Sequence, residues 1–133
     1  NFTVPVERIT RQCSIDVGAG FQRRVESGDL CLSAGGRTVW IALYESKFRE
    51  PERTVNEIYA PGRKPEEEWE IRSEGRYARG YLTRDVDGGY AQWTLTTLTA
   101  SPHRLALVSF SYDAEGQLDW AVRAWDTLQL DRA

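Results

Sequence analysis

Residues 76–112 read RYARGYLTRDVDGGYAQWTLTTLTASPHRLALVSFSY, and this stretch decides the fold. Asp87-Gly88-Gly89 lies between two segments of alternating residues and supplies residues that tolerate the positive φ of a tight hairpin turn. After this turn, Trp93 and Leu95 share one face and polar residues share the other, which is typical of a sheet with one buried face. The segment 104–112 is apolar on both faces. These features predict three consecutive antiparallel strands, with the last one inside the sheet.

The period of the apolar residues changes after residue 116. From there they recur three and four positions apart, which is typical of the buried stripe of a helix. The stripe consists of Leu118, Ala121, Val122, Trp125 and Leu128. We expect a helix over 118–128 that lies across the sheet. Burying each large side chain contributes about 1.5–3 kcal/mol, so Trp125→Ala should be severely destabilising.

The first half of the chain adds strands and one short helix to this core. We expect a strand over 13–17 and a hairpin made of 30–33 and 38–44, joined by Gly35-Gly36. Pro51 suits the first position of a helix of about ten residues, which Pro61-Gly62 ends. A further strand should begin at Trp69.

Together these elements predict an α+β fold for the whole chain. The expected architecture is a single domain over 1–133 with an antiparallel sheet of about six strands. The short helix and the C-terminal helix are expected to pack on one face of this sheet. Residues 1–12 mix charges with apolar residues and are expected to form an edge strand or an arm.

Composition and charge narrow the classes of partner. The net charge of −3 and the pI near 5.2 argue against a nucleic-acid-binding or anionic-membrane surface, which would need a basic stripe. No apolar run of 18 residues exists, so we expect no membrane span. Cys13 and Cys31 are interpreted as small core residues, with a cross-strand disulfide as the alternative if the protein is exported. A cytoplasmic location is favoured over export. The chain contains no Met, so an initiator Met, a signal peptide or a tag is expected to precede residue 1.

No residue pattern in the sequence points to catalysis, a cofactor or a metal. His103, the only histidine, lies at a Ser-Pro-His turn, and no nucleophile motif surrounds a serine, so we interpret it as a turn residue. The consecutive residues 66–68 are all Glu and cannot converge on one substrate as a general acid and base must. Asp85 and Asp87 lack the later ligands of a calcium loop. We therefore expect no catalytic, cofactor-binding or metal-binding residues, and a protein that is not an enzyme.

One face of the expected hairpin carries the candidate binding residues. Alternation places polar and aromatic groups together on the face opposite Trp93 and Leu95. Whether Tyr77 and Tyr90 share this face depends on the hairpin register, which a two-residue turn fixes and a bulged turn at Gly88-Gly89 would shift by one residue. Tyr and Arg are among the residues that dominate interface energies, so this face is a candidate binding site. Its residues are Tyr77, Arg79, Tyr81, Tyr90 and Gln92. The alternative interpretation is a cation–π ladder that only stiffens the surface of the sheet.

The pattern of elements resembles the PsbP-like and DcrB-like α/β superfamily. The resemblance rests on an early hairpin, a crossing helix, a long meander whose last strand reads LALVSFSY, and a C-terminal helix that reads WAVRAWDTLQL. It covers roughly residues 13–130 and departs at the end, where only three residues follow Leu130 and leave no room for a further strand. The resemblance implies a non-enzymatic interaction module, because members are similar to photosystem assembly factors, small lipoproteins and chaperone-like partners of secreted effectors. It transfers no functional residue.

Two hypotheses of function follow. The first is a protein-binding or chaperone-like module, with a homodimer as one form, that uses the open face or an edge of the sheet. The second is a carrier of a small apolar ligand, with a pocket between sheet and helices lined by Trp40, Trp93 and Trp125.

Overall fold

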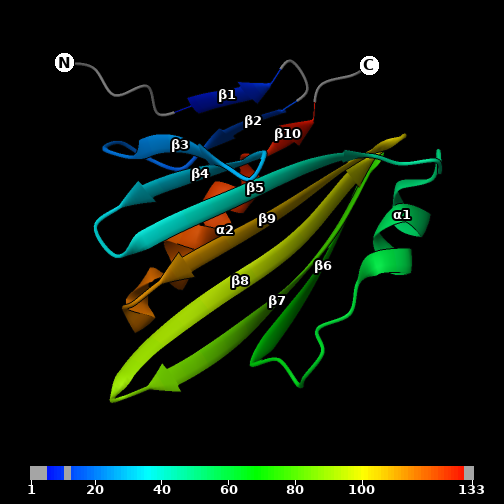
Figure 1. Cartoon of the computed structure of the whole chain (residues 1–133). Helices are drawn as coiled ribbons and strands as arrows, with labels where there is room; N and C mark the ends of the chain where they lie inside the picture. Colours follow the sequence, from blue (N-terminus) through cyan, green and yellow to red (C-terminus); the bar gives the residue numbers. More distant parts are fainter. Residues whose placement is uncertain (1–5, 11–12, 131–133) are drawn as a thin grey trace.

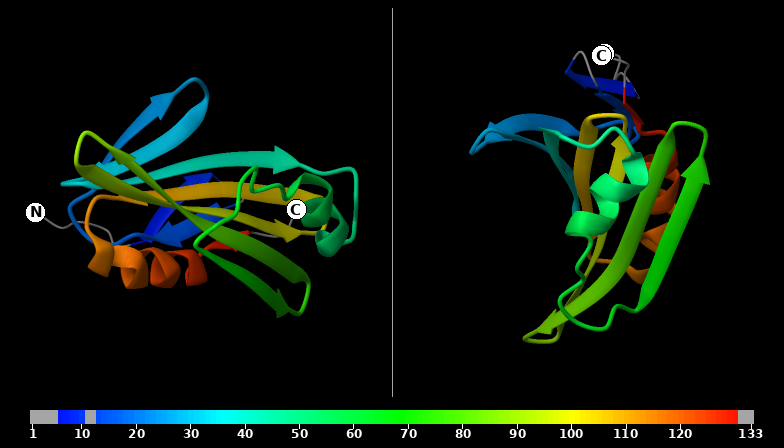
Figure 2. Two further views of the ribbon diagram at one scale, coloured as in Figure 1. Left: turned by 90° about the horizontal axis from the view of Figure 1, so that it is seen from below. Right: turned by 90° about the vertical axis from the view of Figure 1, so that its right-hand side faces the viewer.

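A strongly twisted antiparallel sheet of seven strands forms the body of the protein (Figures 1 and 2). The computed structural model describes residues 6–10 and 13–130. The strand order of this main sheet is β3-β4-β5-β9-β8-β7-β6, and all of its neighbouring strands are antiparallel. Its strands are β3 (Gln22–Glu26), β4 (Asp29–Ala34), β5 (Arg37–Glu45), β6 (Glu67–Ser73), β7 (Arg76–Asp87), β8 (Tyr90–Ser101) and β9 (Arg104–Tyr112).

The glycine-containing turns set the register of the hairpins, as the sequence predicts. Gly88 and Gly89 both have positive φ and connect β7 to β8, with Asp87 paired to Tyr90. Gly35 and Gly36 connect β4 to β5 in the same way. Two adjacent residues with positive φ match the right-handed twist of the flanking strands, so both hairpins close without a bulge.

The alternation of side chains gives the main sheet two different faces. One face carries Ala78, Leu95 and Val108 and packs against the helix α2 (Leu118–Asp126); we call it the α2 face. The other carries Tyr77, Leu98 and Leu105 and packs against the helix α1 (Pro51–Ile58); we call it the α1 face. The two helices therefore lie on opposite faces of the sheet.

This arrangement corrects the expectation that both helices pack on one face. Strands β5 and β9 are apolar on both faces, and a central strand of this kind needs a cover on each side. On β9, Ala106, Val108 and Phe110 belong to the α2 face, whereas Leu105 and Leu107 belong to the α1 face. The sequence already showed apolar residues at both odd and even positions of β5 and β9, which places apolar side chains on both faces of the sheet. The α2 helix covers one of these faces, and α1 covers the other.

The α2 face holds the larger core. The short 3-10 helix η1 (Glu115–Gln117) leads into α2, which buries Trp120, Ala121, Ala124 and Trp125. Trp120 lies outside the predicted stripe, yet its Nε1 donates a hydrogen bond of 2.9 Å to the carbonyl oxygen of Val17. That bond ties α2 to the chain just after β2, so this indole is part of the core although it breaks the predicted pattern.

A second, three-stranded sheet closes one end of the α2 face. It consists of β1 (Val6–Thr10), β2 (Cys13–Asp16) and β10 (Gln129–Leu130), in the order β1-β2-β10. Within the described residues, β1 pairs with β2 at one edge of this sheet. Residues 1–5 and 11–12, which belong to the segment expected to form an edge strand or an arm, lie outside the described residues. The two-residue strand β10 follows shortly after α2 in the chain and pairs with β2.

Cys13 and Cys31 are both buried and are not joined by a disulfide.

The sheet is richer in strands than the predicted six, and the edge strand β3 was not predicted because every one of its residues is exposed and most are polar. Among the described residues, no helix has the length and apolar composition needed to cross a membrane.

The hydroxyl of Tyr112 is buried on the α2 face without a hydrogen-bond partner among the described residues. Burial, and then the negative charge of Glu67, raise the pKa of Tyr112 to about 12. In the unfolded chain the phenol ionises near its ordinary pKa of about 10, so the folded state binds the proton more tightly. The stability that depends on this proton is complete below pH 10 and is lost as the pH rises towards 12.

We therefore expect Tyr112→Phe to leave the stability at pH 7 unchanged or to raise it, because the change removes an unsatisfied buried hydroxyl. The variant should also lose less stability than the wild type between pH 10 and 12. Urea unfolding followed by fluorescence at pH 7 and at several pH values above 10 measures both effects. A loss of more than about 1 kcal/mol at pH 7 would show that the hydroxyl has a partner in solution.

Candidate functional site

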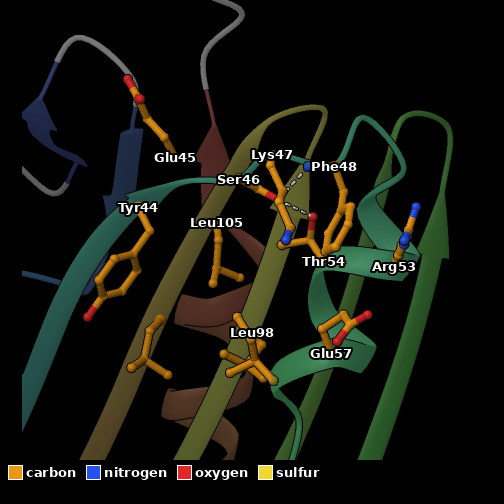
Figure 3. A pocket seen from close by; sticks show the side chains of 12 residues that line it. Tyr44, Glu45, Ser46, Lys47, Phe48, Arg53, Thr54, Glu57, Leu98 and Leu105 are labelled. Carbon is orange, nitrogen blue, oxygen red and sulfur yellow. Dashed lines mark hydrogen bonds between the residues drawn. The ribbon is translucent and has the colours of Figure 1, made fainter.

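An open groove of about 600 Å³ lies between α1 and the α1 face of the main sheet (Figure 3). We call it the α1 groove. Its floor is apolar, and aromatic and charged side chains form its walls and mouth. The lining residues are Tyr44, Glu45, Ser46, Lys47, Phe48, Arg53, Thr54, Glu57, Ile58, Leu98, Leu105 and Leu107.

The floor of the groove comes from strands that are adjacent in the sheet and from one side of α1. Leu98 and Leu105 are buried and form a small core with Val55 of α1. Tyr44 at the end of β5 and Ile58 at the end of α1 are each 51% exposed, so the apolar surface continues to the mouth. An exposed apolar patch beside a hollow is typical of a surface that binds an apolar group.

The loop 46–50 fixes the end of the groove that lies next to the β8–β9 turn. The hydroxyls of Ser46 and Thr54 share a hydrogen bond of 2.6 Å, which joins the loop to the first turn of α1. The backbone N–H of Ser46 donates to the carbonyl oxygen of His103 at 2.8 Å, and the N–H of His103 donates to that of Phe48 at 3.1 Å. These bonds position Lys47 and Phe48 at the mouth.

Two cations lie against one aromatic ring at this mouth. Arg53 Cζ is 4.1 Å and Lys47 Nζ is 5.2 Å from the centroid of the Phe48 ring. Such contacts contribute about 0.5–1 kcal/mol when they are exposed. Within the described part of the chain, neither cation forms an ion pair with a carboxylate. Figure 3 shows Glu45 pointing away from the groove and the Lys47 side chain extending towards Thr54.

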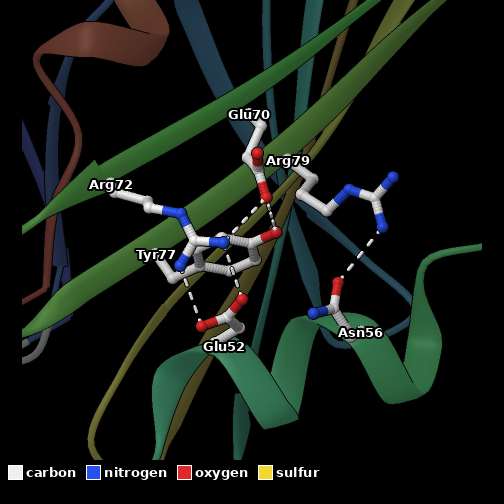
Figure 4. Close-up of polar contacts among 6 residues, drawn as sticks. All are labelled: Glu52, Asn56, Glu70, Arg72, Tyr77 and Arg79. Carbon is white, nitrogen blue, oxygen red and sulfur yellow. Dashed lines mark hydrogen bonds and ion pairs between the residues drawn. The ribbon is translucent and has the colours of Figure 1, made fainter.

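A polar cluster on the other side of α1 anchors the helix to β6 and β7 (Figure 4). Arg72 donates two hydrogen bonds, of 2.9 and 2.8 Å, to the carboxylate of Glu52 at the start of α1. The hydroxyl of Tyr77 donates to Glu70, and Arg79 donates to the side-chain oxygen of Asn56 at 3.1 Å. The hydrogen bond from Arg72 lowers the pKa of Glu52, so the carboxylate remains charged in this pair.

Tyr59, just after α1, extends this anchor. Its hydroxyl donates a hydrogen bond of 2.7 Å to Glu68, and its ring lies 3.6 Å from Arg79 Cζ and edge-on to Tyr81. Burial, and then the hydrogen bond to Glu68, raise the pKa of Tyr59. The phenol therefore remains a donor across the ordinary pH range and holds the end of α1 against the sheet.

The five predicted binding residues do lie on one face of the sheet, the α1 face, as the alternation indicates. Their surroundings divide them into two groups. Tyr77 is buried beneath α1, and Arg79 and Tyr81 contact Asn56 or Tyr59. Tyr90 is 83% exposed and lies with the exposed Gln92 at the far end of the β7–β8 hairpin.

The two groups lie at different positions along the β7–β8 hairpin. Tyr90 pairs with Asp87, ten residues along β7 from Tyr77, and a strand rises about 3.3 Å per residue, so these two tyrosines are about 33 Å apart. Gln92 pairs with Asp85, four residues along β7 from Tyr81, which corresponds to about 13 Å. The structure therefore brings Tyr77, Arg79 and Tyr81 together beside α1 and places Tyr90 and Gln92 elsewhere. A binding role for each of them stays a prediction.

The predicted pocket lined by three tryptophans does not form. Trp125 is buried on the α2 face, where Trp93 stacks on Tyr112 with 6.0 Å between ring centroids. Trp40 pairs with Cys31 and Ser109 on the opposite face, and its Nε1 donates to Asp29 at 3.1 Å. The indoles are separated because the two helices cover different faces of the sheet.

The residues considered for chemistry have structural partners. His103 occupies the turn between β8 and β9 with a φ of 63°, and its Nδ1 lies 3.1 Å from the backbone carbonyl oxygen of Ser46. The hydroxyl of Ser46 is engaged by Thr54. Asp85 accepts a hydrogen bond of 2.9 Å from Arg63. Among the side chains that the structure describes, those of residues 13–130, no three of His, Cys, Asp or Glu are grouped so that they could hold a metal ion.

The α1 groove was not predicted from the sequence. Its residues come from β5, the following loop, α1, β8 and β9, so no local motif marks it. One signal was present: Leu105 and Leu107 alternate with the apolar residues of the α2 face, and Leu98 lies opposite Leu107 on β8. An apolar second face with only one short helix to cover it implies a partly open apolar surface.

Comparison with solved structures supports the fold. The chain is similar to a crystal structure from Bacteroides thetaiotaomicron VPI-5482, with a TM-score of 0.67 over 91% of this chain and a sequence identity of 9%. At this identity the likeness concerns the fold alone. This chain spans 46% of the length of that protein. No family model and no curated protein matches the chain.

Proposed function

We propose that this chain is a non-catalytic binding module that holds an apolar segment of a partner protein in the α1 groove. A chaperone-like role, which the resemblance to the PsbP-like and DcrB-like superfamily implies, is one form of this proposal. The observation that carries it is the apolar floor formed by Leu98, Leu105 and Leu107, which continues to the exposed Tyr44 and Ile58 at the mouth. A concave apolar surface that remains partly exposed is typical of a site that binds an apolar group.

The openness of the groove favours a polypeptide over an enclosed small molecule. A carrier of a small apolar ligand buries most of the surface of that ligand, as in a closed pocket. The α1 groove has a sheet floor and one helical wall, which leaves a side free for a chain to enter and leave (Figure 3). Grooves of this form bind extended or helical segments through a few anchoring side chains.

The test compares one groove variant with one matched variant elsewhere. Ile58→Asp places a charge at the mouth of the groove, where the side chain is 51% exposed, so the fold should be retained. Val86→Asp makes the same change at a site that is 62% exposed on the β7–β8 hairpin. Each tagged protein is used to capture partners from its own source, with quantitative mass spectrometry of what is retained.

The proposal expects a stoichiometric partner that the wild type and Val86→Asp retain and that Ile58→Asp loses by about tenfold or more. Circular dichroism and the melting temperature verify that both variants are folded. Equal capture by the two variants, or no partner with any of the three proteins, would overturn the proposal.

A small apolar ligand remains the second candidate, because a volume of about 600 Å³ is also that of ordinary ligand pockets. Native mass spectrometry of protein purified from its source distinguishes the two. A bound small molecule that Ile58→Asp lacks would favour the carrier.

A further inference from the structure

The two cations at the mouth of the α1 groove indicate the charge of the segment that binds there. Lys47 and Arg53 both contact the ring of Phe48 and, within the described residues, neither is neutralised by a carboxylate. Glu57 lies one helical turn after Arg53, at a spacing that commonly forms an ion pair, yet this pair is not made. The guanidinium instead remains at the ring beside the groove.

An occupant that covers this mouth removes water from both cations. Burying a charge without an opposite charge is unfavourable, so a purely apolar occupant would lose part of the gain from the apolar floor. A basic occupant would add repulsion. An occupant with a carboxylate beside its apolar residues would replace the lost water with charge-assisted hydrogen bonds.

The carboxylates near the groove do not supply this compensation. Glu45 points away from the groove in Figure 3. Glu57 is exposed on α1, where a lysine of an occupant could pair with it. It is therefore the lining residue that would favour a basic occupant over an acidic one. The two cations contact one ring at the mouth, whereas Glu57 is the single carboxylate that α1 contributes to the groove lining, and this difference favours an acidic occupant.

We propose that the partner segment is a short apolar stretch flanked by Asp or Glu, with its carboxylate bound by Lys47 and Arg53 and its apolar side chains on Leu98, Leu105 and Leu107. This inference rests on the function proposed above and names the chemistry of the partner. Charge complementarity of this kind selects between partners more than it raises affinity.

The experiment uses three synthetic peptides with one apolar centre, Leu-Phe-Leu-Leu, flanked on both sides by Asp, by Asn or by Lys. Binding to the whole chain is measured by fluorescence anisotropy at low and high salt. We expect the Asp peptide to bind about fivefold more tightly than the Asn peptide and the Lys peptide more weakly than both. The differences should shrink at high salt, because the Debye length falls from about 10 Å at 0.1 M to about 3 Å at 1 M.

Charge reversal supplies the decisive control. Lys47→Glu should abolish or invert the preference for Asp over Lys, whereas Arg49→Glu, which makes the same change in net charge in the same loop but outside the groove lining, should keep it. Glu57→Gln should preserve the preference for Asp. A preference for the Lys peptide that Glu57→Gln removes would overturn the inference.

The outcomes separate this inference from the function on which it rests. If the three peptides bind with equal affinity and Ile58→Asp abolishes the binding of all three, the groove binds apolar segments without regard to charge. The proposed function then stands, and only the inference of an acidic partner segment fails. If no peptide binds, the inference fails as well, and the capture experiment with Ile58→Asp and Val86→Asp decides the proposed function by itself.

Discussion

Replacement of Trp125 by alanine is expected to lower the free energy of unfolding by about 3–5 kcal/mol. Trp125 is 1% exposed and packs in the middle of the α2 face, so its removal leaves a cavity that the surrounding strands cannot fill. Its Nε1 donates a hydrogen bond of 2.9 Å to the hydroxyl of Thr99, which is also buried and would be left without this donor. Both losses act in the same direction.

Urea unfolding measures the loss, and Trp40→Ala is the matched control. Trp40 is only half-buried on the other face of the sheet, so we expect its removal to cost clearly less. Trp125→Phe keeps an aromatic ring but removes the donor to Thr99, and it should fall between the wild type and Trp125→Ala. A cost of Trp125→Ala no larger than that of Trp40→Ala would contradict the place assigned to this indole.

The second large effect concerns Gly80, which lies in the middle of β7 directly beneath the same ring. A Cβ at this position would lie 2.8 Å from Cη2 and 3.0 Å from Cζ3 of Trp125, which is closer than real contacts allow. The backbone oxygen of Thr96 would lie 3.4 Å from the same Cβ, in ordinary van der Waals contact, so the clash is with the indole ring. We expect Gly80→Ala to cost about 1–3 kcal/mol through overpacking, although alanine suits a strand better than glycine does.

A double-mutant cycle tests the cause of this effect. Combining Gly80→Ala with Trp125→Phe should cost less than the sum of the two single changes, because the smaller ring makes room for the new methyl group. Gly116→Ala is the matched control, since a Cβ there meets nothing within 4 Å and should be neutral or stabilising. Additive costs at positions 80 and 125 would show that the methyl group does not meet the ring.

The parts of the fold that the sequence predicted are those with local causes. The two-glycine turns, the alternation along β8 and the periodicity of α2 each depend on residues close together in the chain, so they could be read directly. β3 was not predicted because all its residues are exposed, so no buried face shows in its sequence, and it is held in the sheet by its pairing with β4. Strand propensity gives little signal where packing does not select the residues.

The candidate site was predictable only in part, because it depends on which face each helix covers. Alternation correctly placed Tyr77, Arg79 and Tyr90 on one face. It could not show that α1 would cover Tyr77 and engage Arg79 while leaving Tyr90 in water. The α1 groove combines five segments from residue 44 to residue 107, and only the three-dimensional arrangement brings them together.

The two walls of the α1 groove differ in how firmly they are held. The sheet side belongs to a core shared by central strands, whereas α1 buries only Thr54 and Val55 and is otherwise held by polar contacts at the surface. Local opening occurs first where few apolar contacts must be broken. The groove therefore has one stiff wall and one compliant wall. A shift of α1 would widen it while the packing around Trp125 stays intact, so the groove can accommodate side chains of different sizes without unfolding the domain.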